Sequence, residues 1–89
     1  MSNFIRVPYV ELLQRAARIR QEADNVRMEI RRLEETVESL QWMGKRAERF
    51  FQMWERARPE MQAWATTLET FATSLEAQAR RMQVADEGF

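Results

Sequence analysis

The residues of this chain best placed to do chemistry are paired carboxylates such as Glu34 and Glu38, whose four-residue spacing puts both on one face of a helix. Two carboxylates can bind a metal or move a proton, but either task needs further groups. The chain contains no His and no Cys, so the commonest metal ligand, the commonest general base and any thiolate nucleophile are missing. We therefore expect no enzymatic activity, no metal site and no bound cofactor.

Composition further narrows the classes of protein to consider. The 89 residues suffice for one small domain over residues 1–89, and 14 basic side chains balance 14 acidic ones. This balance, without a basic block, argues against nucleic acid as a partner. No apolar run approaches the roughly 20 residues that span a bilayer, and the stretch from Met1 to Tyr9 lacks the charged-then-apolar order of a signal peptide. We expect any export to proceed without a classical signal peptide.

The first half of the chain has the apolar periodicity of a long helix. Its apolar residues alternate in steps of four and three, at Leu12, Ala16, Ile19, Ala23, Val26, Ile30, Leu33, Val37 and Leu40. A seam sustained in this way predicts an amphipathic helix over about residues 8–40 with coiled-coil-like packing. The residues between seam positions form a charged face that we expect to be solvated, including Arg31, Arg32, Glu34, Glu35 and Glu38.

The second half repeats the pattern with larger side chains. Its seam residues are Ala47, Phe50, Trp54, Ala57, Met61, Trp64, Leu68, Phe71, Leu75 and Met82. They predict a helix over about residues 45–84, followed by a flexible C-terminal tail. Pro59 removes one backbone hydrogen bond and clashes with the preceding turn, so we expect a kink near residues 55–58. One kinked helix is favoured over two separate helices because Pro59 lies off the seam.

A link of four residues, 41–44, separates the two expected helices. A link this short makes the helices antiparallel neighbours, so we expect a helical hairpin. The link contains Trp42-Met43-Gly44, in which glycine permits the positive φ that a tight turn needs. Trp42 has two interpretations, a core aromatic that caps the bundle or a recognition residue, and the first does not exclude the second.

A hairpin buries one narrow seam, and this chain has more apolar surface than that. Leu13 and Ala17 widen the stripe early in the first helix, and three alanines widen it late in the second, at Ala65, Ala72 and Ala79. A wide exposed stripe marks an interface, so the predicted fold is all-α, a helical hairpin that dimerises into a four-helix bundle. The residues expected in the hairpin and dimer interfaces are Leu12, Leu13, Ile19, Val26, Ile30, Leu33, Phe50, Trp54, Met61, Trp64, Leu68, Phe71 and Leu75.

Four stretches of the chain resemble one family of bacterial proteins. Trp42-Met43-Gly44 matches the family's central Trp-x-Gly motif, and Ile5-Arg6-Val7, before a helix that starts with proline, is similar to its opening. Glu38-Ser39-Leu40 before the motif and Arg58-Pro59-Glu60-Met61 after it also resemble family stretches. Over essentially its whole length, the chain resembles the Trp-x-Gly (WXG) family of small ESAT-like (Esx) type VII secretion substrates.

This resemblance implies a function without catalysis. Such proteins form homodimers, or heterodimers with a paralogous Trp-x-Gly protein, and are exported folded by a membrane-bound FtsK/SpoIIIE-type ATPase. They serve as substrates, as components of the secretion machine or as carriers for larger toxins. The resemblance thus implies that this chain is cytoplasmic before export and extracellular afterwards.

The family's export signal also includes an aromatic-x-x-x-acidic motif near the C-terminus. The best match here is Met82 with Asp86, in which methionine stands at the aromatic position. Two interpretations stay open for this pair, an export signal or a fraying helix terminus. In an antiparallel dimer, Trp42-Met43-Gly44 of one subunit would lie near this segment of the other and form a composite site.

Two other functions are compatible with the same fold. An intracellular helical adaptor or chaperone for a larger toxin would stay in the cytosol after its client leaves. A membrane-active protein would lay its separated amphipathic helices in a bilayer interface. The balanced charge of this chain differs from that of cationic membrane-surface helices, so we keep membrane interaction as a secondary hypothesis.

Overall fold

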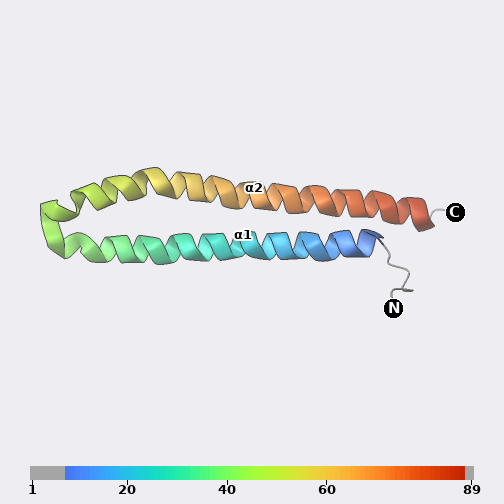
Figure 1. Cartoon of the computed structure of the whole chain (residues 1–89), viewed down its shortest axis with the longest axis horizontal. Coiled ribbons are helices and arrows are strands. Elements are labelled where there is room, and N and C mark those ends of the chain that lie inside the picture. The colour runs from blue at the N-terminus through green and yellow to red at the C-terminus, as the bar shows by residue number, and fades with distance from the viewer. Residues whose placement is uncertain (1–7, 88–89) are drawn as a thin grey trace, which may run out of the picture.

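The computed structural model describes residues 8–87, so Ile5-Arg6-Val7 lies outside the described residues. Two long helices, α1 (Pro8–Glu38) and α2 (Glu48–Glu87), run antiparallel and side by side, and a 3₁₀ segment, η1 (Ser39–Ala47), joins them (Figure 1). The molecule is a rod of 68 × 27 × 13 Å. The prediction of an all-α helical hairpin is confirmed, and no strand occurs in the described part of the chain.

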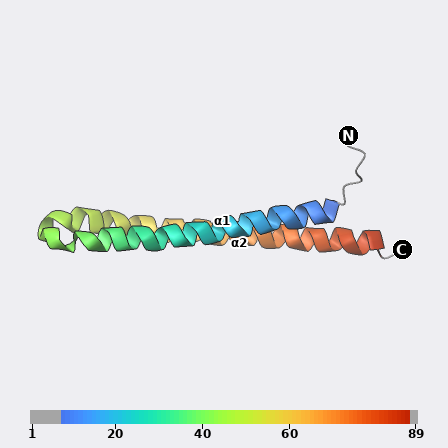
Figure 2. The ribbon, with the colours of Figure 1, turned by 90° about the horizontal axis from the view of Figure 1, so that it is seen from below.

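The helix α1 buries one of the two rows of residues that make up its predicted seam. Ala16, Ala23 and Ile30, spaced by seven residues, are fully or almost fully buried. Because seven residues make nearly two turns of helix, these three side chains lie in one line along α1. The two helices cross one another along the rod, as Figure 2 shows from below, which is how long helices with such a repeat keep their seams in contact.

The helix α2 presents a different row to α1 from the one that the sequence suggested. Ala65, Ala72 and Ala79 were expected to lie beside the seam, but each is fully buried between the helices. Trp64 and Phe71, expected on the seam as core residues, are 55% and 53% exposed. The physical reason is that alanine allows two helix backbones to approach closely. When the alanines face α1, the aromatic residues that directly precede two of them in sequence point away from the contact between the helices.

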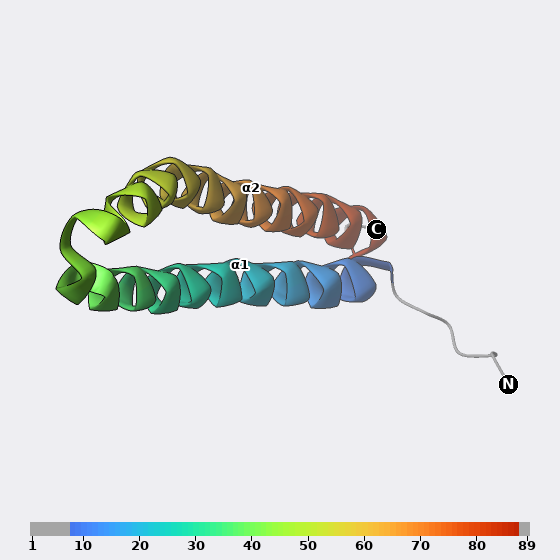
Figure 3. The same ribbon diagram turned by 60° about the vertical axis from the view of Figure 1, so that its left-hand side comes forward.

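The segment that joins the helices is longer than the link expected at residues 41–44, and it is wound as a 3₁₀ helix. The helix α1 ends at Glu38, and α2 starts at Glu48 after the 3₁₀ segment. Gly44 interrupts this segment with φ 61° and ψ −133°, a backbone conformation that non-glycine residues avoid. The positive φ expected at Gly44 is therefore observed. The chain reverses direction over the segment that joins α1 to α2 (Figure 3).

We expect Gly44→Ala to destabilise the hairpin by roughly 1–3 kcal/mol, the usual cost of forcing a side chain into this backbone region. A Cβ atom at Gly44 would meet no other atom within 4 Å, so the cost comes from the backbone and not from a clash. Urea unfolding of the variant measures it. Lys45→Ala, at the neighbouring position with helical backbone angles, is the matched control. Equal stability of both variants would contradict the role given to Gly44.

The helix α2 is continuous through Pro59 and extends to Glu87, past the expected end near residue 84. It bends in the yellow part of the ribbon in Figure 1, the part of the helix that contains Pro59. The missing N–H and the bulk of the proline ring against the preceding turn explain this bend. Of the tail that the sequence predicted, residues 85–87 are helical, and residues 88–89 lie outside the described part.

Candidate functional site

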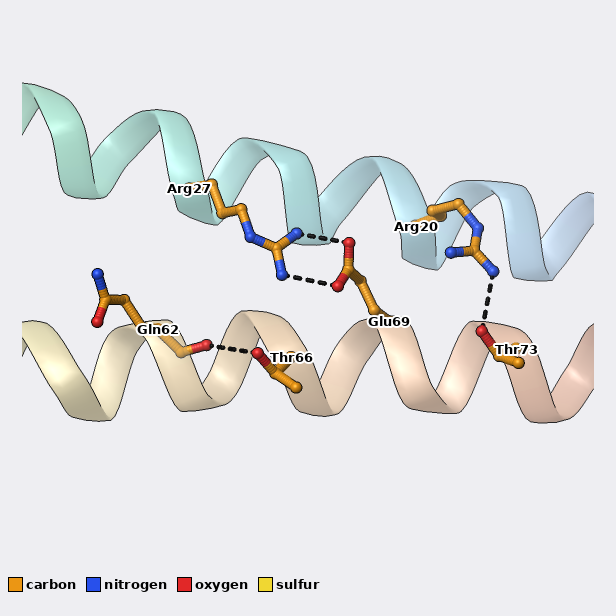
Figure 4. Close-up of polar contacts among 6 residues, drawn as sticks. All are labelled: Arg20, Arg27, Gln62, Thr66, Glu69 and Thr73. Carbon is orange, nitrogen blue, oxygen red and sulfur yellow. Dashed lines mark hydrogen bonds and ion pairs between the residues drawn. The ribbon is translucent and has the colours of Figure 1, made fainter.

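A row of ion pairs joins α1 to α2 along one edge of the hairpin. Figure 4 shows the pair of Arg27 with Glu69 and the hydrogen bond of Arg20 to Thr73. Arg27 donates two parallel hydrogen bonds to the carboxylate of Glu69, with N···O distances of 2.6 and 2.7 Å. Arg20 approaches Glu76 at 2.7 Å and also donates to the hydroxyl of Thr73 at 3.2 Å. Such bidentate contacts fix geometry, so this row sets the register in which the helices pair.

A third pair extends the row toward the turn, because Arg58 Nη1 lies 2.7 Å from Glu34 Oε2. Glu34 was expected on a solvated face, but it is half-buried and paired with α2. Among residues 8–87, no three acidic side chains gather where they could share a metal ion. We call this row the ion-paired edge, made of Arg20, Arg27 and Glu34 of α1 with Arg58, Glu69 and Glu76 of α2.

We expect Glu69→Gln to lower stability at neutral pH and to have no effect in strong acid. The hydrogen bonds from Arg27 hold the pKa of Glu69 below its ordinary value. The carboxylate therefore stabilises the folded chain above the pKa of the unfolded chain, and this contribution disappears as the pH falls through the lowered pKa. Thermal unfolding midpoints of variant and wild type should converge on acidification.

The matched control for that experiment is Glu35→Gln, at an exposed position of α1. We expect its midpoint to stay close to that of the wild type at every pH. A difference between Glu69→Gln and wild type that persists in strong acid would show that the side chain acts through packing and not through its charge.

The opposite edge of the hairpin is apolar. Each residue of the ion-paired edge follows an apolar residue directly in sequence, and consecutive helix residues point about 100° apart. The buried row lies between the direction of the ion-paired residues and that of the apolar residues before them. These apolar residues therefore point to the edge opposite the ion-paired edge. They are Ile19, Val26 and Leu33 on α1 and Ala57, Leu68 and Leu75 on α2. Together with Met61, Trp64 and Phe71 they form what we call the apolar edge.

The apolar edge contains a hollow between the two helices. It has a volume of about 420 Å³ and is lined by Val26, Ala57, Met61 and Trp64, with two glutamates, Glu29 and Glu60, completing its lining. Within the hairpin, the largest side chain of this lining, that of Trp64, is more than half exposed. A surface of this kind, apolar at its centre and charged at its margin, is typical of a protein interface.

The hairpin alone forms an incomplete core. Of the eight buried apolar residues among residues 8–87, six are alanines, so the close contact between the helices removes little apolar surface from water. The accessible surface of the chain is 7210 Å², whereas a compact monomer of 10.7 kDa is expected to expose about 5,500 Å². A two-helix rod of these dimensions therefore leaves more of its surface in water than a compact domain of the same mass.

The expected interface residues fall into three groups in the structure. Ile30 and Trp54 are buried between the helices. The exposed ones are Leu13, Phe50, Trp64 and Phe71. The half-buried ones are Leu12, Ile19, Val26, Leu33, Met61, Leu68 and Leu75. Sequence reasoning missed the alanine row as the hairpin contact and missed the ion-paired edge, although charged residues directly after apolar ones at seven-residue spacing were a visible signal for the second.

Trp42 projects from the turn into solvent. Its side chain is 80% exposed, whereas Met43 beside it is half-buried and Ala47 is fully buried. Within one hairpin, Trp42 therefore has no role as a core residue. Burying an indole ring removes a large apolar surface from water and lowers the free energy. An exposed tryptophan at a fixed turn is therefore suited to contact with another molecule.

Met82 and Asp86 lie near the other end of the rod, on the last turns of α2. Met82 is half-buried and lines a hollow of about 280 Å³ with Pro8 and Leu12 at the start of α1. Asp86 is exposed. Both residues belong to a helical segment whose end is tied to α1, because the Tyr9 hydroxyl donates a hydrogen bond to Glu87 at 3.2 Å. That bond raises the pKa of Tyr9 above its ordinary value.

Neither described helix contains a stretch long and apolar enough to cross a membrane.

The comparison with known protein families agrees with these features. The model of the WXG100 family, described as proteins of 100 residues with WXG, matches residues 5–87 and thus both helices and the turn. The family is associated with small substrates of type VII secretion and not with enzymes. No curated protein and no solved structure gives a significant match. The family match covers nearly the whole chain and includes Trp42-Met43-Gly44 at the turn of a helical hairpin, and the protein therefore belongs to the WXG100 family.

Proposed function

We propose that this chain is a small substrate and partner protein of a type VII secretion system, exported as a folded dimer by an FtsK/SpoIIIE-type ATPase. The observation that carries the proposal is the 80% exposure of Trp42, the tryptophan of the family motif. A tryptophan that stabilised only its own hairpin would be buried. An exposed one, held in place by the tight turn at Gly44, is available to another protein.

The second half of the proposed recognition site consists of Met82 and Asp86. In a single hairpin these residues are separated from Trp42 by most of the length of α2, which is about 60 Å for 40 residues. An antiparallel partner brings its own C-terminal segment beside Trp42, so a dimer unites both halves at each end. The partner is another copy or a paralogous Trp-x-Gly protein, and larger toxins are possible cargo. In this proposal the protein is cytoplasmic before export and extracellular afterwards.

Pulse labelling of the native host tests this proposal against the intracellular adaptor. Newly made protein is followed in cells and in medium, with a cytosolic enzyme as the marker of lysis. We expect label to leave the cells and to accumulate in the medium while the marker stays inside. Label that remains in the cytosol while a larger toxin is exported would overturn the proposal in favour of the adaptor.

A further inference from the structure

We infer that a hollow at the turn end of the ion-paired edge binds a basic side chain of a partner protein. This turn-end hollow lies between α1 and α2, has a volume of about 230 Å³, and has Glu34, Glu38, Glu55 and Arg58 as the charged part of its lining. Because Glu34 and Arg58 belong to the ion-paired edge, a protein that covers the opposite, apolar edge leaves this hollow open.

The order of charges along the ion-paired edge leaves a cation missing at this end. The first two ion pairs, seven residues apart on both helices, share one register. The same register sets Glu34 against the neutral Gln62, and Glu34 pairs instead with Arg58, four residues nearer to η1. One step further, it sets Gln41 against Glu55, where neither residue is a cation. The ion-paired edge therefore ends with an excess of carboxylates.

Three carboxylates and a single guanidinium line the turn-end hollow. Arg58 Nη1 lies 2.7 Å from Glu34 Oε2, whereas Arg58 Nη2 lies 3.7 Å from Oε2 of Glu55, whose side chain is 70% exposed. Among residues 8–87, no basic side chain pairs with Glu38. The lining thus carries more negative than positive charge, and a cation from another molecule would complement it.

A second and independent feature of the turn-end hollow is an unpaired donor. Trp54 belongs to its lining and is only 9% exposed, and the indole N–H has no acceptor within the described part of the chain. Leaving a buried donor without a partner is unfavourable, so nearly all such groups in proteins are paired. The hairpin supplies no acceptor here, and an incoming molecule can.

A basic residue of a polypeptide supplies each group that the turn-end hollow lacks. Its charged head complements Glu38 and Glu55, its methylene stem packs on Val37 and Phe51, and its backbone carbonyl is an acceptor for the indole N–H. A metal ion brings neither the stem nor the acceptor. Since one water molecule takes about 30 Å³ in the liquid, the hollow is several times larger than an ordered water needs and has room for a side chain.

The position of the turn-end hollow connects it with the exposed tryptophan of the turn. Gln41 belongs to its lining and directly precedes Trp42, at the end of the rod where η1 joins the helices (Figure 1). A protein that contacts Trp42 therefore lies within reach of the hollow. The inference rests on the proposed function only in taking the partner to be the protein that contacts Trp42.

Titration with a short peptide tests the charge complementarity. The probe is acetyl-Gly-Arg-Gly-amide, and the control peptide carries citrulline, which has nearly the shape of arginine without its charge. Nuclear magnetic resonance follows the indole N–H of Trp54 and the side-chain amide of Gln41, which both belong to the lining. We expect both signals to shift and to saturate with the arginine peptide and not with the citrulline peptide.

The matched variants remove the same charge inside and outside the turn-end hollow. Glu38→Gln/Glu55→Gln should raise the dissociation constant of the arginine peptide about tenfold, the effect of losing two exposed ion pairs. Glu22→Gln/Glu35→Gln, at exposed positions outside the lining, should leave it unchanged. Equal shifts with both peptides, no saturation, or equal affinity of the two double variants would overturn the binding site.

Export from the native host tests the connection with Trp42. We expect Glu38→Gln/Glu55→Gln to lower export several-fold relative to Glu22→Gln/Glu35→Gln. Wild-type export from the first variant would overturn the assignment of the partner to the protein that contacts Trp42. Because the peptide titration needs no secretion system, its failure would leave the proposed function standing as long as export of the wild type depends on the ATPase.

Discussion

Trp64→Ala is expected to raise the dissociation constant of the dimer about a thousandfold. Truncating a central aromatic residue of an interface costs about 2 kcal/mol or more, and the proposed dimer, when it consists of two copies of this chain, contains Trp64 twice. Together they amount to about 4 kcal/mol, which corresponds to about three powers of ten. Sedimentation equilibrium measures the change as the shift from a species of twice 10.7 kDa to one of 10.7 kDa.

The matched control for this experiment is Met53→Ala, which truncates another strongly exposed apolar residue of α2, far from the helix midpoint. We expect it to weaken the dimer much less than Trp64→Ala does. Circular dichroism should show that both variants keep the helical content of the wild type, because neither side chain belongs to the buried row between α1 and α2. A dimer of unchanged affinity in Trp64→Ala would contradict the place given to this residue.

Trp42→Ala is expected to abolish export while leaving the fold intact. Because Trp42 is 80% exposed, its removal should change the free energy of unfolding of the hairpin by less than about 0.5 kcal/mol, the usual effect of a surface substitution. Export depends instead on recognition of the indole ring, so the amount in the medium should fall to the background set by lysis. Thermal unfolding of purified protein and immunoblots of cells and medium measure the two effects.

Trp42→Phe serves as the companion variant, because it keeps an aromatic ring at the same exposed turn position. We expect partial export from it. Two results would contradict the role of Trp42 in recognition. One is wild-type export from Trp42→Ala, and the other is a marked loss of stability, which would show that the side chain supports the fold.

The sequence predicted α1 more accurately than α2, for a reason visible in the side chains. On α1, the predicted seam consists of two rows with seven-residue spacing, and the row that contains Ala16, Ala23 and Ile30 is the buried one. On α2, two apolar rows with this spacing stand one residue apart. One contains Trp64 and Phe71, and the other contains Ala65, Ala72 and Ala79. Periodicity alone does not distinguish them, and hydrophobicity favours the wrong one, because close approach of the helices requires the small side chains.

The charged flank of each helix could be read from the sequence, but the individual ion pairs could not, because they depend on the register between the helices. The doublets Ile19-Arg20, Val26-Arg27 and Leu33-Glu34 mark one charged and one apolar flank on α1. Which residues of α2 face Arg20 and Arg27 depends on how the turn aligns the two helices. The 3₁₀ geometry of Ser39–Ala47 sets that alignment. Residue types do not show whether such a segment forms a 3₁₀ helix or continues as an α-helix, because the two conformations differ little in energy.

The sequence predicted which residues form the candidate site, but it did not predict how exposed their side chains are. Trp42-Met43-Gly44 marked the turn correctly, since the chain reverses there and Gly44 has positive φ. The exposure of Trp42 follows from the geometry of η1, which the sequence did not specify. Met82 and Asp86 were placed on a common helix face by their spacing, and the half-buried position of Met82 against Leu12 follows from the length of α1.

The measurement that tests the central claim most directly is the amount of this protein in the medium of the native host, with the FtsK/SpoIIIE-type ATPase either active or unable to hydrolyse ATP. With the active ATPase, we expect the protein in the medium at a level far above that of a cytosolic lysis marker. With the inactive ATPase, we expect it to accumulate as folded protein inside the cells and to fall to the level of the marker outside. Equal extracellular amounts in the two strains would contradict the claim that this protein is a substrate of type VII secretion.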